Sequence, residues 1–222
     1  MDNYVITIAR GFGSGGKQVG LALSRDLGIP CYESQILALA SEYSGLNKRW
    51  FVKADEKLPL PYSFLPKLKS TPSTDHIVTP QDRKFTSARN LFNIQTKIIR
   101  ELAEKESCII IGKCANYLLR DFSNVISVYV EAPRAYCLAN IMKKFNATEE
   151  EAARLITETD KYRAAYFRYY TRGRIWTDPV LYDMTLNSER VGLNKCVELI
   201  KAYIKIKFPG ASLPKQDPLG ST

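Results

Sequence analysis

A glycine-rich segment at residues 11–17 has the residue types and spacing to bind phosphate. It reads G-x-x-x-x-G-K and closes with Lys17. Glycines let backbone N–H groups curl around phosphate oxygens, and a lysine at a helix start adds charge where the helix dipole favours an anion. Glycines also serve ordinary strand-to-helix turns. The lysine spacing favours a phosphate-binding loop, made of Gly11, Phe12, Gly13, Ser14, Gly15, Gly16, Lys17 and Gln18.

The position after Lys17 lacks the hydroxyl that often helps to hold Mg²⁺ in such loops. Gln18 stands there, and Val19 follows it. We therefore expect phosphates and water to hold Mg²⁺, and we assign no residue as a direct metal ligand. Ser14 could contact a phosphate or a water, although a serine in a turn more simply bonds its own backbone.

The segments around the loop follow the order strand, turn, helix. Residues 4–9 form a β-branched run typical of a buried parallel strand, and helical spacing follows over residues 17–27. Similar alternation predicts strands at residues 29–32, 107–111, 125–130 and 182–186, and helices at 35–43, 86–106, 133–145 and 192–204. The pattern predicts an α/β fold in which a five-stranded parallel sheet carries helices on both faces.

Two regions interrupt this alternation. Residues 53–85 carry five prolines without periodicity, which favours a functional insertion or, equally, a surface loop. Residues 146–176 open with a capping-box pattern at Thr148 and Glu151, and a helix is predicted to continue to about Tyr170. We expect one domain over residues 1–208, with its core at 1–52, 86–145 and 177–208, followed by a flexible tail at 209–222.

Composition and charge narrow the class of protein. Of the 222 residues 45% are hydrophobic and 25% charged, without an apolar run near the roughly 20 residues of a membrane span. No signal-peptide pattern opens the sequence, and the five scattered cysteines favour reduced thiols. We therefore expect a soluble cytoplasmic protein without a membrane partner. The net charge of +9 suits a polyphosphate, a nucleic acid or an acidic surface without choosing among them.

Four separated segments together resemble the cytidylate kinase-like family, a branch of the P-loop nucleoside monophosphate kinases. They are residues 6–17, 27–32, 109–116 and 159–166, the last with Trp176, Tyr182 and Asp183. The first and last segments are specific to the family. The resemblance implies the P-loop NTPase fold, with an insertion at about 53–85 that binds the nucleoside monophosphate acceptor and a helical lid at about 146–176. It also implies ATP- and Mg²⁺-dependent phosphoryl transfer to a nucleoside monophosphate, CMP or dCMP in the activity that names the family.

The resemblance further implies which side chains act. Lys17 would bind the ATP phosphates, and Arg163 would meet the transferring phosphoryl group while Asp160, on the same helix face, orients it. Lys113 and Asn116 stand where relatives typically have arginine and aspartate, so Lys113 keeps the charge but loses the planar fork. Other candidates, each on its own better explained as an ordinary surface charge, are Arg83, Arg89 and Arg100 for the acceptor and Arg154, Arg168, Arg172 and Arg174 for the lid.

Several residues leave alternatives open. Cys137 and Asn140 stand where relatives often carry arginines. Together with Lys113 and Asn116, they favour as one alternative a protein that binds nucleotide without turnover. Another retains phosphoryl transfer to a different small acceptor. Tyrosines and basic residues interleaved at 161–174 would suit single-stranded nucleic acid, yet their helical spacing is explained by an aromatic stripe that packs against the body. We expect ATP and a small phosphorylated acceptor as partners rather than nucleic acid, and leave a homo-oligomer open.

Overall fold

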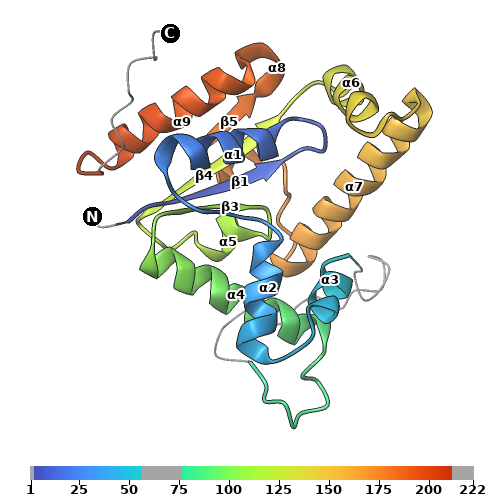
Figure 1. Ribbon diagram of the computed structural model, residues 1–222, viewed down its shortest axis with the longest axis vertical. Helices are drawn as coiled ribbons and strands as arrows, with labels where there is room; N and C mark the ends of the chain where they lie inside the picture. The colour runs from blue at the N-terminus through green and yellow to red at the C-terminus, as the bar shows by residue number, and fades with distance from the viewer. Residues whose placement is uncertain (1–2, 57–76, 212–222) are drawn as a thin grey trace, which may run out of the picture.

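The computed structural model describes residues 3–56 and 77–211, and it is built on a five-stranded sheet (Figure 1). The strands are β1 (Val5–Arg10), β2 (Cys31–Tyr32), β3 (Cys108–Ile111), β4 (Val125–Glu131) and β5 (Met184–Asn187). All pairs are parallel, in the order β2-β3-β1-β4-β5. The central strand β1 pairs Val5 with Cys108 on one side and with Val125 on the other. The predicted five-stranded parallel sheet is confirmed.

One face of the sheet is covered by α1 (Gly16–Leu27) and α9 (Leu193–Lys207), which lie together in Figure 1. Ile6 and Ile8 of β1 point to this face and pack with Val19 and Leu23 of α1 and with Ile200 of α9. Side chains alternate along a strand, so the same β-branched run also supplies the opposite face. A short helix, α8 (Ser188–Val191), connects β5 to α9.

The opposite face is covered by α2 (Gln35–Ser44), α3 (Lys48–Glu56), α4 (Ala88–Lys105) and α5 (Ala115–Leu118). Val5 of β1 and Ile110 of β3 point into this second core, where they meet Ile36 and Ile99 of the helices. The side chain of Ser87 caps the start of α4 by accepting a hydrogen bond from the Asn90 N–H. Helices therefore lie on both faces, as the alternation predicted.

Two further helices, α6 (Arg134–Phe145) and α7 (Glu149–Tyr170), form an arm beside the carboxyl edge of the sheet (Figure 1). The predicted capping box is present, because Thr148 accepts from the Glu151 N–H and Glu151 accepts from the Thr148 N–H. The ring of Tyr170 stacks on Phe92 with 3.7 Å between centroids. The aromatic stripe of α7 thus packs against the body, which confirms the preferred explanation of its spacing. A turn of 3-10 helix, η3 (Pro179–Leu181), precedes β5.

The structure also differs from the sequence prediction. Helix α3 extends to residue 56, so the region predicted at 53–85 to lack periodicity begins as a helix, held to the core by the fully buried Phe51. The short α5 was not predicted, because four residues are too few to show a period. The rest of the predicted insertion at 57–76 and the tail from 212 lie outside the described residues. Within the described ranges, no helix is both long and apolar enough to cross a membrane.

Candidate active site

The glycine-rich loop connects β1 to α1 at the carboxyl edge of the sheet, as its sequence predicted. Gly13 adopts φ 91°, a left-handed conformation that favours glycine. The Ser14 hydroxyl is fully buried and lies 2.9 Å from the carbonyl oxygens of both Gly11 and Val130. Ser14 therefore bonds the backbone around it, in agreement with the simpler interpretation of a turn serine.

A cavity of about 590 Å³ lies against this loop and is called the loop cavity here. Every predicted loop residue except Ser14 lines it, together with Arg10, Glu33, Arg163 and residues of α6. The Lys17 side chain is half exposed, and its ammonium lies 2.5 Å from a Glu33 carboxylate oxygen. The loop cavity thus has the backbone curvature and the cation that a phosphate chain needs.

Helix α6 packs against the glycine-rich loop at Cys137 and Asn140. The Asn140 side chain donates to the Gly13 carbonyl at 2.8 Å. A Cβ on Gly13 would lie 2.8 Å from the Cys137 carbonyl oxygen, so only a glycine fits beside this turn of α6. The Asn140 side chain and the backbone of Cys137 therefore both lie against the loop at Gly13. Lys143 and Lys144, which the sequence analysis did not select, line the same cavity from the end of α6.

Helix α7, which lies in the region predicted to form a lid, contacts the loop directly. One Asp160 carboxylate oxygen accepts from the Phe12 N–H at 2.9 Å, and the same oxygen lies 3.4 Å from the Arg163 guanidinium. Arg163 also donates to the Arg10 carbonyl at 3.1 Å and lies over the Phe12 ring. The predicted pairing of Asp160 and Arg163 on one helix face is confirmed, and it places both at the loop.

Burial sets the electrostatics of this contact. It raises the pKa of Asp160, an effect that the Phe12 N–H and the positive charge of Arg163 oppose. Burial also lowers the pKa of Arg163 to about 10, and the neighbouring charge of Arg10 adds to the decrease. The guanidinium groups of Arg10 and Arg163 therefore lie close together beside the loop.

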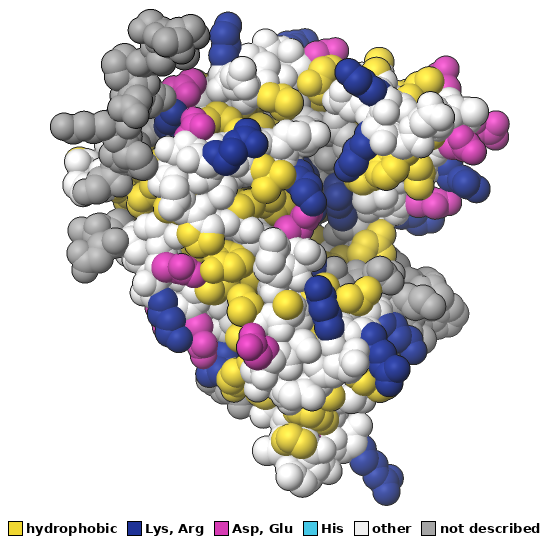
Figure 2. Space-filling view, viewed as in Figure 1, with side chains coloured by type: hydrophobic (Ala, Val, Ile, Leu, Met, Phe, Trp, Pro, Cys, Tyr) yellow, Lys and Arg dark blue, Asp and Glu magenta, His cyan; other side chains and the backbone are white. Residues whose placement is uncertain are grey.

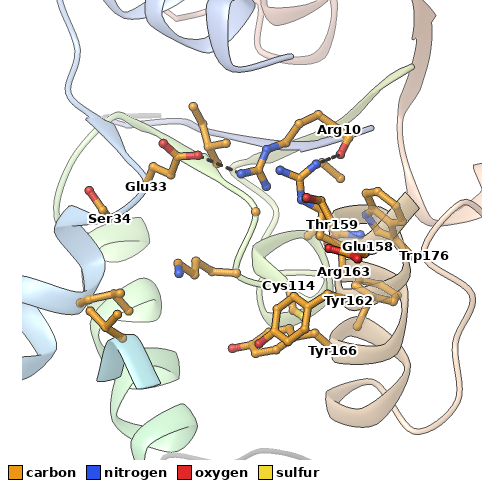
Figure 3. Close-up of a pocket in the computed structure, with 18 residues that line it drawn as sticks. Arg10, Glu33, Ser34, Cys114, Glu158, Thr159, Tyr162, Arg163, Tyr166 and Trp176 are labelled. Carbon is orange, nitrogen blue, oxygen red and sulfur yellow. Dashed lines mark hydrogen bonds and ion pairs between the residues drawn. The ribbon is translucent and has the colours of Figure 1, made fainter. Parts of the chain in front are cut away.

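A second cavity, of about 690 Å³, shares lining residues with the first and is called the aromatic cavity (Figure 3). Tyr162, Tyr166 and Trp176 form one wall, and Figure 3 shows Tyr162 and Tyr166 along α7. Both acceptor candidates that follow β3, Lys113 and Asn116, line it. Lys113 has φ 56°, an uncommon left-handed value for lysine that a functional site can retain.

Three residues line both cavities: Arg10, Glu33 and Arg163. Glu33 lies 2.8 Å from Arg10 and 2.5 Å from Lys17. Burial acts to raise the pKa of Glu33, but the Lys17 hydrogen bond and the charges of Arg10 and Lys17 outweigh it, and the pKa lies below its ordinary value. Neither Arg10 nor Glu33 was selected from the sequence, although ligands of parallel sheets bind at the carboxyl ends of strands, where both residues stand.

The remaining predicted arginines lie elsewhere. Arg83 and Arg89 line neither cavity, and Arg100 donates to the Leu118 carbonyl while its guanidinium lies over the Phe122 ring. In the lid, Arg154, Arg168 and Arg172 are exposed and outside both cavities, and Arg174 lines a separate cavity of about 330 Å³. Lys and Arg side chains nevertheless gather at a hollow beside α6 and α7 (Figure 2).

The donor set at the loop fits Mg²⁺ that is bound mainly through phosphate. In the ranges that the structure describes, no three His, Cys, Asp or Glu side chains come together as a metal site. Gln18 lines the loop cavity in the place of the usual hydroxyl residue. Among the described residues, the one carboxylate that lines this cavity is Glu33, and it is paired with Lys17 and Arg10. Phosphate oxygens and water would therefore supply most ligands of a bound Mg²⁺.

The parallel sheet order and the loop define the class as proteins with the P-loop kinase fold. An uncharacterized protein from Eubacterium ventriosum aligns with TM-score 0.66 and 23% identity, over 91% of this chain and 99% of that one. A shikimate kinase from Bacteroides thetaiotaomicron aligns with TM-score 0.50 and 12% identity, over 91% and 98%. A search of curated proteins gave no match. The model of the cytidylate kinase-like family matches residues 5–190, and the chain belongs to this family.

Proposed function

We propose that the protein transfers the γ-phosphoryl group of ATP to a nucleoside monophosphate, with CMP or dCMP as the first candidates. The observation that carries the proposal is the meeting of two cavities at Arg10, Glu33 and Arg163, directly beside the phosphate loop. A donor in one cavity and an acceptor in the other would place their phosphates at this junction. Membership of the cytidylate kinase-like family supports the same reaction class.

The loop cavity is the donor side of the proposed site. Backbone N–H groups of the loop would surround the ATP phosphates, and Lys17 would exchange its bond to Glu33 for a phosphate oxygen. Arg163, held by Asp160 and by the Arg10 carbonyl, would neutralise charge on the moving phosphoryl group. Bound Mg²⁺ would supply further neutralisation of the phosphates.

The aromatic cavity is the acceptor side. Its wall of Tyr162, Tyr166 and Trp176 offers rings against which a planar base can pack, and Asn116 offers both a hydrogen-bond donor and an acceptor. Lys113 provides a positive charge for the acceptor phosphate. The volume of the aromatic cavity, about 690 Å³, lies within the usual range of roughly 300–1,000 Å³ for small-molecule sites.

The position of Glu33 favours a second candidate, a P-loop kinase that acts on an alcohol. A hydroxyl acceptor gains from a carboxylate that accepts its proton, as in other phosphotransferases, whereas a phosphate acceptor needs no such base. Glu33 lies at the cavity junction where such a hydroxyl would stand. Its lowered pKa and its two cationic partners make Glu33 a weak base. A nucleoside monophosphate therefore remains the first candidate for the acceptor.

A screen of acceptors with ATP and Mg²⁺ tests the proposal. Ribo- and deoxyribonucleoside monophosphates and small polyols would each be offered, and the phosphorylated product detected by mass. We expect a pyrimidine monophosphate to give most product and Lys17→Ala to give none. Preferred phosphorylation of a polyol would favour the second candidate, and nucleotide binding without any product would favour the non-catalytic alternative.

A further inference from the structure

Arg10 is the last residue of β1, directly before the phosphate loop. Its side chain is mostly buried, pairs with Glu33 at 2.8 Å and lines both cavities. Gly112, which follows β3, keeps the neighbouring strand end open for it: a Cβ there would lie 2.3 Å from the Arg10 Nη1 atom. The guanidinium is thus packed against the backbone of the adjacent strand end rather than extended into solvent.

Arg10 and Arg163 come from distant parts of the chain and meet at the junction of the cavities (Figure 3). Arg163 donates to the Arg10 carbonyl at 3.1 Å, and the charge of Arg10 contributes to the lowered pKa of Arg163. Two neighbouring buried cations repel each other, and an anion that lies near both offsets this repulsion. Glu33 is the ion-pair partner of Arg10, and Asp160 is that of Arg163. A phosphoryl group at the junction would meet both guanidinium groups.

We propose that Arg10 is a further catalytic residue, which binds the phosphoryl group together with Arg163 as that group passes from the loop cavity to the aromatic cavity. The inference rests on the phosphoryl-transfer function proposed above and adds a residue to it. The planar guanidinium can offer two parallel N–H donors to phosphate oxygens, which a lysine cannot. Glu33 holds Arg10 in place until a phosphate competes for it.

The affinity of the protein for inorganic tripolyphosphate, measured by calorimetry, tests this role without any acceptor. Arg10→Gln is expected to bind tripolyphosphate roughly tenfold more weakly than the wild type, because one charged hydrogen-bond donor is lost. Arg10→Lys keeps the charge but not the fork, so its affinity should be intermediate. Arg120→Gln is the matched control, because Arg120 lies outside both cavities and pairs with Asp121. It should bind as the wild type does.

A folded Arg10→Gln variant with wild-type affinity for tripolyphosphate would overturn the inference. If Arg10→Gln does not fold, wild-type affinity in Arg10→Lys would overturn it instead. Phosphorylation of CMP is measured separately, and there Arg10→Gln should lower kcat about 100-fold. A protein whose affinity for tripolyphosphate depends on Arg10 but which phosphorylates no acceptor would contradict the proposed function, and Arg10 would then be a phosphate-binding residue without a catalytic role.

Discussion

Glu33 forms ion pairs with two cations, the Lys17 ammonium at 2.5 Å and the Arg10 guanidinium at 2.8 Å. In the function proposed above both cations bind phosphate, so this one carboxylate holds together two groups of the proposed site. The same interaction stabilises the fold, because it lowers the pKa of Glu33 in the folded protein. The contribution is modest, since the Lys17 side chain is half exposed and water screens its charge.

Glu33→Gln should lower the free energy of unfolding at neutral pH by up to about 1 kcal/mol. A carboxyl group with a lowered folded-state pKa stabilises the protein above its unfolded pKa of about 4.3, and this contribution disappears as the pH falls through the folded value. The difference between variant and wild type should therefore shrink in acid. Urea unfolding at several pH values measures it, with the exposed Glu42→Gln as control. A difference that persists unchanged in strong acid would contradict this origin.

Helix α7, the proposed lid, brings Asp160 and Arg163 to the loop. Its capped start is fixed by local sequence, whereas its position depends on Asp160 and Arg163 contacting the loop. Asp160 accepts from an N–H of the phosphate loop, where a phosphate oxygen could also bind. We therefore expect this contact to couple the position of α7 to phosphate binding at the loop.

Asp160→Ala should loosen this contact and increase hydrogen exchange at the Phe12 amide and over the second half of α7. Asp160→Asn retains an oxygen acceptor for the Phe12 N–H but loses the charge that faces Arg163, so its exchange should lie between that of Asp160→Ala and wild type. Lys161→Gln changes an exposed neighbour on the same helix and serves as control. Equal exchange at Phe12 in all four proteins would show that Asp160 does not hold the lid.

Across the whole molecule, the five cysteines report on the packing of both cores and of the cluster between α6 and α7. Cys108, Cys114, Cys137 and Cys196 are buried and Cys31 is half-buried, and all are free thiols. Burial raises the pKa of Cys108 to about 12 and that of Cys137 to about 11, and burial and then the charge of Glu33 raise the pKa of Cys31 to about 11. Thiolate, the reactive form, is therefore scarce at neutral pH.

The native protein should react slowly with an aromatic disulfide reagent at mildly alkaline pH, and all five thiols should react at once after unfolding in guanidinium chloride. Release of the coloured thiolate product measures both rates. A fast phase in the native protein that corresponds to one or more thiols would contradict the close packing around these cysteines.

The local features of the fold could be predicted from sequence, and the long-range ones could not. The β-branched run of β1, the glycine loop and the capped α7 each have a local pattern, and the structure confirms them. Glu33 meets Lys17 only because β2 and β1 flank β3 in the sheet, an order that no local pattern contains. Arg10 could not be selected from the sequence for the same reason, because its contacts are with Gly112 and Arg163, far along the chain.

Transfer of label from ATP to CMP is the most direct test of the proposed phosphoryl transfer. The wild-type protein is incubated with Mg²⁺, CMP and ATP labelled in its γ-phosphoryl group, beside Lys17→Ala under the same conditions. The two-cavity site predicts labelled CDP with the wild type and none with Lys17→Ala, because the loop loses its cation. The proposed phosphoryl transfer would be contradicted if the label remained in ATP with CMP and with every other acceptor. It would also be contradicted if Lys17→Ala transferred the label equally well.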